Sequence, residues 1–154
     1  MNQLDNKWIE MYLDIATRAS KESHAKRLQV GAVFVSKSGV MSLGINGMPS
    51  GASNNCEYFS KEYGRDRTKP EVSHAEENLI TKLLKEGISS NGGTIYLTHS
   101  PCINCAKLLA NSGIERIYYM NTFNKTAGIG YIKKHFTIEI IHYEKEDSKK
   151  GKTL

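Results

Sequence analysis

Two short motifs constrain this chain more than any other part of its sequence. His74 is followed two residues later by Glu76, and a Pro-Cys-x-x-Cys run further on contains Cys102 and Cys105. One imidazole and two thiolates fill three corners of a tetrahedral Zn²⁺ ion and leave the fourth for water, which is the arrangement of a catalytic zinc. We therefore predict that His74, Cys102 and Cys105 bind zinc and that Glu76 carries protons. A lone Cys-x-x-Cys pair also fits a redox site, but the two motifs together favour zinc catalysis.

The residues around both motifs predict helix starts. Ser73 is a suitable N-cap, with Glu76 three residues later completing a capping box, and apolar residues then continue a helix to Gly87. A second helix is predicted to open at Ser100 or Pro101, which places both motif cysteines on its first turn. The positive end of the helix dipole and the metal both favour thiolate over thiol at that place.

The rest of the chain predicts an α/β fold with a mixed five-stranded sheet. An amphipathic pattern predicts a first helix, and two β-branched, apolar runs predict strands that form a hairpin. Further strands then alternate with helices. The predicted elements are helices over 4–20, 73–87, 100–113 and within 124–134, and strands over 28–36, 40–45, 94–98, 114–120 and 136–143. The polar segment 52–69 is long for an unstructured loop, and loops of that length tend to be functional or mobile.

Length and composition set broader limits. Residues 1–154 are predicted to form a single domain, with a frayed tail over 144–154. Lysine and arginine number 21 against 16 aspartate and glutamate, a weak indication of anionic partners such as nucleotides. Neither a secretion signal nor an apolar membrane span is visible, so we expect an intracellular, cytoplasmic protein. Three cysteines fit metal binding in a reducing compartment, with Cys56 left over as a plain thiol.

Four segments resemble the zinc-dependent cytidine and deoxycytidylate deaminase superfamily, and more narrowly the deoxycytidylate (dCMP) deaminases. The zinc motifs are similar to those of the superfamily, and the Asn-Gly-Met-Pro loop resembles the dCMP branch. The resemblance implies a three-layer α/β/α fold and hydrolytic deamination of dCMP to dUMP and ammonia, which supplies dUMP for thymidylate synthesis. It also implies a homo-oligomer, commonly a hexamer, that dCTP activates and dTTP inhibits. The matching segments are 29–33, 46–51, 74–78 and 100–108.

The resemblance further implies roles for residues around the zinc motifs. The backbone N–H of Ala75 would meet the pyrimidine O2, and Asn46 would hydrogen-bond the sugar. Ser100 and Pro101 would shape the pocket around the amine. An effector triphosphate, accompanied by Mg²⁺, would meet the loop after the second strand, where the implied residues are Gly47, Met48, Pro49 and Gly51. The basic residues around Lys21, Lys26 and Arg27 are further candidates for this effector site.

The sequence leaves the phosphate site open. The 5′-phosphate of dCMP needs cationic partners, and nothing in the sequence selects among Arg65, Arg67, Lys69 and Lys125. Some family members hold a second, structural zinc near the Asn-Gly-Met-Pro loop. Here its ligands would be limited to Cys56 and the distant His24, so we expect one zinc per subunit. Of the other histidines, His99 lies next to the cysteine motif and is the one to examine.

Three other functions fit part of the pattern. A tRNA adenosine deaminase or a single-strand cytosine deaminase shares the zinc chemistry, but it needs a groove of basic and aromatic groups for the flanking nucleotides. Cys105-Ala106-Lys107 resembles the dCMP branch and disfavours a nucleic-acid substrate. A cytidine deaminase would need no phosphate site. A non-catalytic zinc-stabilised binding module is disfavoured by the three-ligand count and by Glu76.

Overall fold

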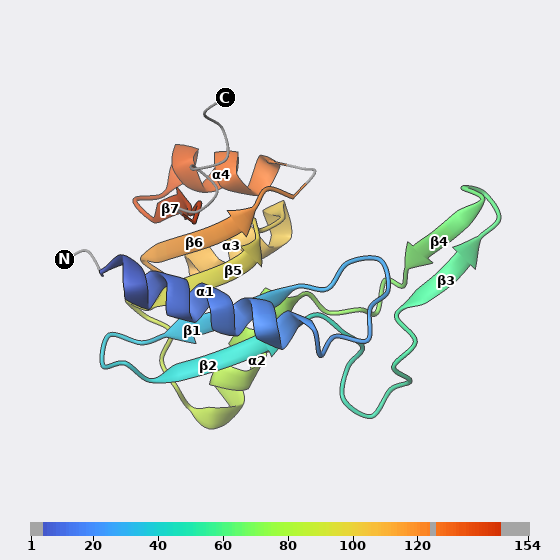
Figure 1. The fold of residues 1–154 in the computed structure, drawn as a ribbon, viewed down its shortest axis with the longest axis horizontal. Helices are drawn as coiled ribbons and strands as arrows, with labels where there is room; N and C mark the ends of the chain where they lie inside the picture. Colours follow the sequence, from blue (N-terminus) through green and yellow to red (C-terminus); the bar gives the residue numbers. More distant parts are fainter. Residues whose placement is uncertain (1–4, 124–125, 146–154) are drawn as a thin grey trace.

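The computed structural model describes residues 5–123 and 126–145, and a five-stranded sheet forms its centre (Figure 1). The strands of this sheet are β1 (Gly31–Val35), β2 (Met41–Ile45), β5 (Thr94–His99), β6 (Arg116–Asn121) and β7 (Glu139–His142). Their order is β2-β1-β5-β6-β7; β1 is antiparallel to both of its neighbours, whereas β5, β6 and β7 run parallel. The mixed five-stranded sheet expected from the sequence is therefore confirmed.

Helices cover both faces of this sheet and give the expected three layers. Helix α1 (Asn6–Ser20) lies on one face. The other face carries three helices, α2 (Ala75–Glu86), α3 (Ile103–Asn111) and α4 (Ala127–His135). Side chains alternate along β5, so that Ile95 and Leu97 pack toward α2 and α3 while Tyr96 packs toward α1. None of the described helices is both long and apolar enough to cross a membrane.

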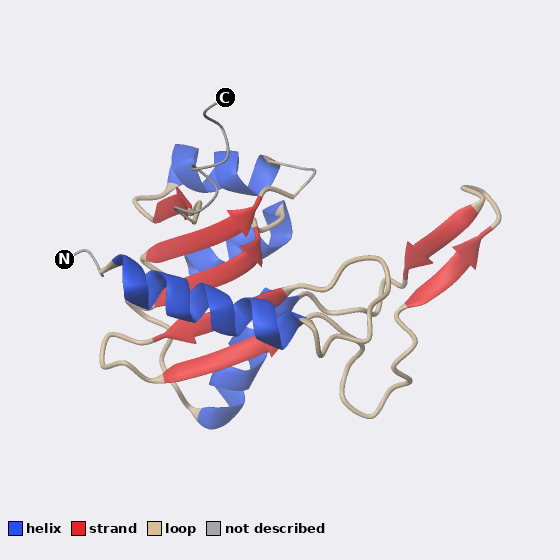
Figure 2. Cartoon of the chain, viewed as in Figure 1, coloured by secondary structure: helices blue, strands red, loops and turns tan. Residues whose placement is uncertain are grey.

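The sequence predicts a long loop over 52–69, and the structure instead contains a two-stranded antiparallel sheet there. Its strands, β3 (Glu57–Ser60) and β4 (Arg65–Thr68), project from the body of the molecule and are called the arm below (Figure 1 and Figure 2). Within the described residues, β3 and β4 contact each other and no other helix or strand. Sequence reasoning missed β3 because Glu57-Tyr58-Phe59-Ser60 lacks the alternation of apolar and polar residues that marks a strand.

Two glycines allow close packing at the N-terminal ends of α2 and α3. A Cβ atom at Gly44 of β2 would collide with the carbonyl oxygen of Ala75, so α2 can start against this strand because residue 44 has no side chain. A Cβ atom at Gly128 of α4 would likewise collide with the carbonyl oxygen of Pro101, just before α3. Close packing on β2 and on α4 therefore positions the first turns of the two helices that carry the zinc motifs.

Candidate active site

His74 lies at the N-terminal end of α2, where it is itself the capping residue. The prediction that Ser73 caps this helix is wrong by one residue, because Ser73 pairs instead with Gly47 through two backbone hydrogen bonds of 3.1 and 2.9 Å. The carboxylate of Glu77 accepts a hydrogen bond of 3.0 Å from the backbone N–H of His74. Glu77 and His74 thus form the capping box that was predicted for Glu76 and Ser73, and Glu76 takes no part in it.

The two motif cysteines lie at the start of α3. Cys102 caps the helix, and its Sγ accepts a hydrogen bond of 3.5 Å from the backbone N–H of Cys105. The helix consequently begins at Ile103, later than the predicted start at Ser100 or Pro101. A cysteine sulfur, rather than a serine hydroxyl, accepts the hydrogen bond at this helix end.

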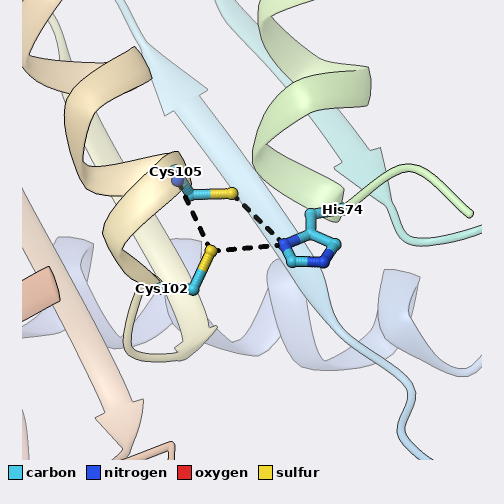
Figure 3. A group of neighbouring side chains, drawn as sticks. All are labelled: His74, Cys102 and Cys105. Atoms are coloured by element: carbon cyan, nitrogen blue, oxygen red, sulfur yellow. Dashed lines mark hydrogen bonds between the residues drawn. The ribbon is translucent and has the colours of Figure 1, made fainter. Parts of the chain in front are cut away.

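The three predicted ligands converge on one point (Figure 3). His74 Nδ1 lies 3.5 Å from Cys102 Sγ and 3.4 Å from Cys105 Sγ, and all three atoms lie within 4.8 Å of one another. With Zn–N and Zn–S bonds of about 2.0 and 2.3 Å, the edges of a zinc tetrahedron measure roughly 3.5 to 3.8 Å. The three side chains therefore fit one zinc ion. Across residues 5–123 and 126–145, no other group of three or more such side chains is placed to hold a metal.

The third cysteine lies in an apolar cluster. Cys56 is buried with Ala25 and Val72, and Met48 packs against all three. Its Sγ is 3.5 Å from the carbonyl oxygen of Asn54. The neighbours of Cys56 are thus packing partners rather than metal ligands.

Hydrogen bonds among the three ligands determine their protonation in the metal-free protein. A bond from the Cys105 thiol, reinforced by one from His74, lowers the pKa of Cys102 to about 3. The bond to Cys102 raises the pKa of His74 to about 9, and the bond with Cys102 together with burial raises the pKa of Cys105. The three ligands thus shift one another's pKa values, with the charged form favoured at Cys102. A metal binds the deprotonated forms of all three side chains, so metal binding competes with protons at this site.

Glu76 is buried beside these ligands, with 4% of its surface exposed. Burial raises the pKa of its carboxyl to about 7, although its own backbone N–H and the nearby His74 favour the charged form. A carboxyl group with this pKa can both accept and release a proton near neutral pH. The side chain that sequence reasoning assigned to proton transfer thus lies in an environment suited to that chemistry.

A cavity of about 360 Å³ opens in front of His74, Cys102 and Glu76. Its walls come from the starts of α2 and α3, the ends of three sheet strands, the loop before β1 and the base of the arm. Cavities of this volume are in the range that holds small organic ligands. The site can therefore bring a small polar substrate against a metal and a titratable carboxyl group.

Comparison with known proteins agrees with this geometry. Residues 6–121 match the family model described as the cytidine and deoxycytidylate deaminase zinc-binding region. The chain belongs to this deaminase family. The deoxycytidylate deaminase of Mycobacterium phage D29 is 36% identical over 122 residues, covering 73% of this chain and 93% of that protein. The deoxycytidylate deaminase of Enterobacteria phage T4 is 31% identical over 176 residues, covering 90% of this chain and 91% of that protein.

A solved deaminase structure is also similar. The dCMP deaminase from cyanophage S-TIM5, in complex with dCMP and dUMP, matches with a TM-score of 0.83 and 35% sequence identity. The match covers 92% of this chain and 100% of that chain. Family membership and the grouping of His74, Cys102 and Cys105 together support zinc as the metal of this deaminase.

The deaminase pocket contains most of the predicted substrate residues. Asn46, Ala75 and Ser100 line it, whereas Pro101 is buried outside its wall. Ser100 also joins two strands, because its Oγ accepts a hydrogen bond of 2.8 Å from the N–H of Phe123, which follows β6. The residues predicted to bind an effector are not among those that line the pocket: Gly47, Met48, Pro49 and Gly51.

The side chain of Asn46 is already bonded to the protein. Its Oδ1 accepts a hydrogen bond of 2.9 Å from the N–H of Val30, and its Nδ2 donates one of 2.8 Å to the carbonyl oxygen of Leu28. Val30 and Leu28 also line the pocket. The side chain of Asn46 therefore holds the backbone of the pocket wall at Leu28 and Val30 in place. One amide hydrogen and one oxygen lone pair of Asn46 remain for other partners.

Two pocket residues, Arg27 and Thr68, were not predicted as substrate-site residues. Arg27 Nη1 donates a hydrogen bond of 3.0 Å to Thr68 Oγ1, and the two residues are 41 positions apart in sequence. Glu57 Oε1 accepts hydrogen bonds from the backbone N–H groups of Lys26 and Arg27, at 2.8 and 3.2 Å. The base of the arm thereby positions Arg27. No local sequence pattern marks this pair, because only the folding of the arm brings them together.

The cations predicted for the phosphate lie elsewhere. Arg65 and Arg67 belong to the arm, where the guanidinium of Arg67 lies 4.4 Å from the ring centroid of Tyr63. Neither these two nor Lys69 is among the pocket-lining residues. Lys125 lies outside the described residues. Arg27 is the one lysine or arginine that lines the pocket in the part of the chain that the structure describes.

Glu76→Gln is expected to stabilise the metal-free protein at alkaline pH but not at acidic pH. Burial raises the pKa of Glu76 from its ordinary 4.5 to about 7, so folding favours the protonated carboxyl. The resulting stabilisation is fully present below pH 4.5 and is lost as the pH rises through about 7, a loss of about 3 kcal/mol. Glutamine does not titrate and shows no such loss. The free energy of unfolding is measured for the wild type and for Glu76→Gln at pH 5 and pH 8.5, after a chelator has removed the metal from both. A difference between the two proteins that is the same at both pH values would contradict the prediction.

Proposed function

We propose that this chain catalyses the hydrolytic deamination of dCMP to dUMP and ammonia. The observation that carries the proposal is one pocket lined by His74, Cys102, the buried Glu76 and the cation Arg27, with Cys105 grouped with His74 and Cys102 at its wall. A metal, a titratable carboxyl and a cation are the three groups that deamination of a phosphorylated pyrimidine needs. The similar phage proteins are deoxycytidylate deaminases, which supports the same substrate here.

Glu76 is assigned the proton transfers of the reaction. Zinc held by the three ligands would supply a water acidic enough to act as a nucleophile near neutral pH. The carboxylate of Glu76 accepts a proton from the attacking water and delivers it to N3 of the cytosine. It then accepts the second proton, from the hydroxyl group now on C4, and delivers it to the departing amine, so that a C4 carbonyl remains and ammonia leaves. Its pKa of about 7 suits both directions, because neither form of the carboxyl is strongly disfavoured at neutral pH.

Backbone groups and Asn46 are assigned the orientation of the substrate. Ala75 is the first residue of α2, so its N–H has no acceptor within the helix and can donate to the pyrimidine O2. Ser100 supplies backbone on the side of the amine, and Pro101 supports it from behind the wall. The amide hydrogen and the oxygen lone pair of Asn46 that are not bonded to the protein are assigned to hydrogen bonds with the sugar.

The 5′-phosphate of dCMP is assigned to Arg27. Arg27→Gln is expected to raise KM for dCMP by about 10- to 100-fold, because a hydrogen bond to a charged group contributes about 1.5 to 3 kcal/mol. The kcat/KM for deoxycytidine should change little, since deoxycytidine has no phosphate. Steady-state kinetics with both substrates measure the effect.

Arg65→Gln is the matched control for Arg27→Gln, because Arg65 is an arginine of the arm that does not line the pocket. It should leave KM for dCMP within about twofold of the wild type, the scale of a surface substitution of about 0.5 kcal/mol or less. Equal losses on dCMP and deoxycytidine in Arg27→Gln would show that Arg27 supports the fold of the pocket instead of binding phosphate.

An ammonia-release assay tests the function itself. Zinc-loaded protein is compared on dCMP, dCTP, deoxycytidine and a tRNA anticodon stem-loop, and dCMP is expected to be the preferred substrate. Release from the stem-loop alone would support a nucleic-acid deaminase. Absence of release from every substrate, with zinc bound, would support a zinc-stabilised binding module instead.

Assembly and regulation form a further part of the proposal. A homo-oligomer, a hexamer by the resemblance, would be activated by dCTP and inhibited by dTTP, with Mg²⁺ accompanying the triphosphate. The support is the backbone pairing of Gly47 with Ser73, which joins the predicted effector loop to the residue before His74. Rate curves for dCMP with and without each triphosphate test the regulation, and identical curves would refute it. Sedimentation measures the subunit count.

A further inference from the structure

Thr68 lies in the pocket, but the proposed mechanism assigns it no role. It is the last residue of β4, the second strand of the arm. Of the described residues 57–68, which form the arm, only Thr68 lines the pocket, and its side chain is exposed there. Thr68 is therefore the point at which the arm meets a bound substrate.

Hydrogen bonds hold Thr68 next to the segment that carries Arg27. Thr68 is paired with Glu57 across the two strands of the arm. The carboxylate of Glu57 accepts hydrogen bonds from the backbone N–H groups of Lys26 and Arg27, at 2.8 and 3.2 Å. Glu57 is buried and does not line the pocket. The arm thus brings the hydroxyl of Thr68, and not the carboxylate of Glu57, to the surface of the pocket.

The hydroxyl of Thr68 has a hydrogen to donate. Its Oγ1 accepts a hydrogen bond of 3.0 Å from Nη1 of Arg27. Across residues 5–123 and 126–145, Oγ1 takes part in no other hydrogen bond, and a hydroxyl that accepts one bond can still donate its own hydrogen. The hydroxyl hydrogen and the other N–H groups of the guanidinium are therefore neighbouring donors in one wall of the pocket.

A phosphate group suits this pair of donors. A phosphate monoester carries more than one negative charge at neutral pH and has three oxygens that accept hydrogen bonds. Arg27 supplies a single positive charge, and no other lysine or arginine among the described residues lines the pocket. Since Thr68 Oγ1 lies 3.0 Å from Nη1, a phosphate that accepts from the guanidinium brings its oxygens within reach of the hydroxyl.

We propose that Thr68 is a phosphate-binding residue, whose hydroxyl accepts from Arg27 and donates to the 5′-phosphate of the substrate. The inference rests on the proposed function and on the assignment of the phosphate to Arg27. It adds a second phosphate ligand and gives the arm a direct part in substrate recognition. The preference for dCMP over deoxycytidine then depends on both residues.

The first test compares Thr68→Val with Thr68→Ser on dCMP and deoxycytidine. Valine keeps the branched shape and removes the hydroxyl. It should lower the ratio of kcat/KM for dCMP over deoxycytidine by about 10-fold or more, the effect of losing a hydrogen bond to a charged group. Serine keeps the hydroxyl and should recover most of this loss. Thr81→Val, at an exposed threonine of α2 outside the pocket, is the matched control and should leave the ratio unchanged.

The second test separates direct contact with phosphate from an effect through Arg27. Thr68→Val is introduced into the Arg27→Gln protein, and the same ratio is measured. A hydroxyl that binds phosphate itself should still contribute, so the ratio should fall further than in Arg27→Gln alone. No further fall would overturn the proposal, because Thr68 would then only orient Arg27. An equal loss on dCMP and deoxycytidine in Thr68→Val would overturn it as well.

A binding measurement distinguishes failure of this inference from failure of the proposed function. Titration calorimetry with dUMP and deoxyuridine needs no turnover, and Thr68→Val should lower the affinity for dUMP relative to deoxyuridine by a similar factor. A wild type that is inactive on dCMP, but in which Thr68→Val changes this ratio, would reject the deaminase and retain the phosphate site. An active wild type with an unchanged ratio would retain the deaminase and reject the role of Thr68.

Discussion

Replacing Glu76 with glutamine is expected to lower kcat for dCMP by about 10²- to 10⁴-fold, the range over which removal of a general acid or base registers. Glutamine keeps the size of the side chain and can still form hydrogen bonds, but it cannot accept the proton of the attacking water. Zinc content should stay at one ion per chain, because Glu76 lies beside the three ligands and is not one of them. Initial rates and metal analysis on the same preparation measure both quantities.

Glu71→Gln is the matched control for Glu76→Gln. Glu71 is an exposed carboxylate only a few positions away in sequence and does not line the pocket. Its loss should leave kcat near that of the wild type. A zinc-loaded Glu76→Gln protein with nearly normal turnover would show that another group moves the protons.

Cys105→Ser is expected to lower zinc affinity by more than about 100-fold. Loss of a residue that only hydrogen-bonds to a metal ligand already lowers metal affinity by about 10- to 100-fold, and Cys105 is itself a ligand. Cys105 is buried at the start of α3 and its Sγ lies 3.4 Å from His74 Nδ1, so a shorter, harder hydroxyl cannot replace it. Activity should fall in proportion to the zinc lost. Metal analysis after dialysis against a weak chelator, together with competition against a chromogenic chelator, measures the affinity.

Cys56→Ser provides the comparison for Cys105→Ser. Cys56 is equally buried, but its neighbours are Ala25, Val72 and Met48. The substitution places a hydroxyl in an apolar cluster and should lower stability while zinc content stays at one per chain. Retention of stoichiometric zinc by Cys105→Ser, or its loss in Cys56→Ser, would reverse the assignment of ligands.

The metal site could be predicted from sequence because its chemistry depends on residue types at short spacing. His74 and Glu76 share the first turn of one helix, and Cys102 and Cys105 share another, so local rules place each pair correctly to within one or two residues. The N-cap was misplaced because Ser73 is the better cap by residue type. The backbone of Ser73 instead forms hydrogen bonds with Gly47, which lies 26 positions earlier in the sequence. Local sequence rules do not predict such a long-range pair.

The pocket wall could not be predicted in the same way. Three residues of this wall come from separate segments: Arg27 from a loop, Thr68 from the arm and His99 from the end of β5. The antiparallel pairing of β1 with β5 brings the segment before β1 next to the end of β5, and the hydrogen bond from Arg27 to Thr68 adds the arm. The strands of the arm were missed because their outward side chains include Tyr58 and Phe59, which break the polar alternation of an exposed hairpin. Long-range pairing, rather than residue type, decides these positions.

The arm has a practical consequence for protein engineering. Hydrogen bonds of Glu57 and Thr68 join its base to the segment around Arg27, whereas the residues of the turn over 61–64 are all exposed. In the described part of the chain, its strands contact no other helix or strand. Exposed turns of this kind are the positions at which proteins best tolerate inserted sequence. An epitope or a fluorescent-label peptide placed within 61–64 would therefore report on the enzyme without disturbing the sheet, the helix starts or the metal ligands.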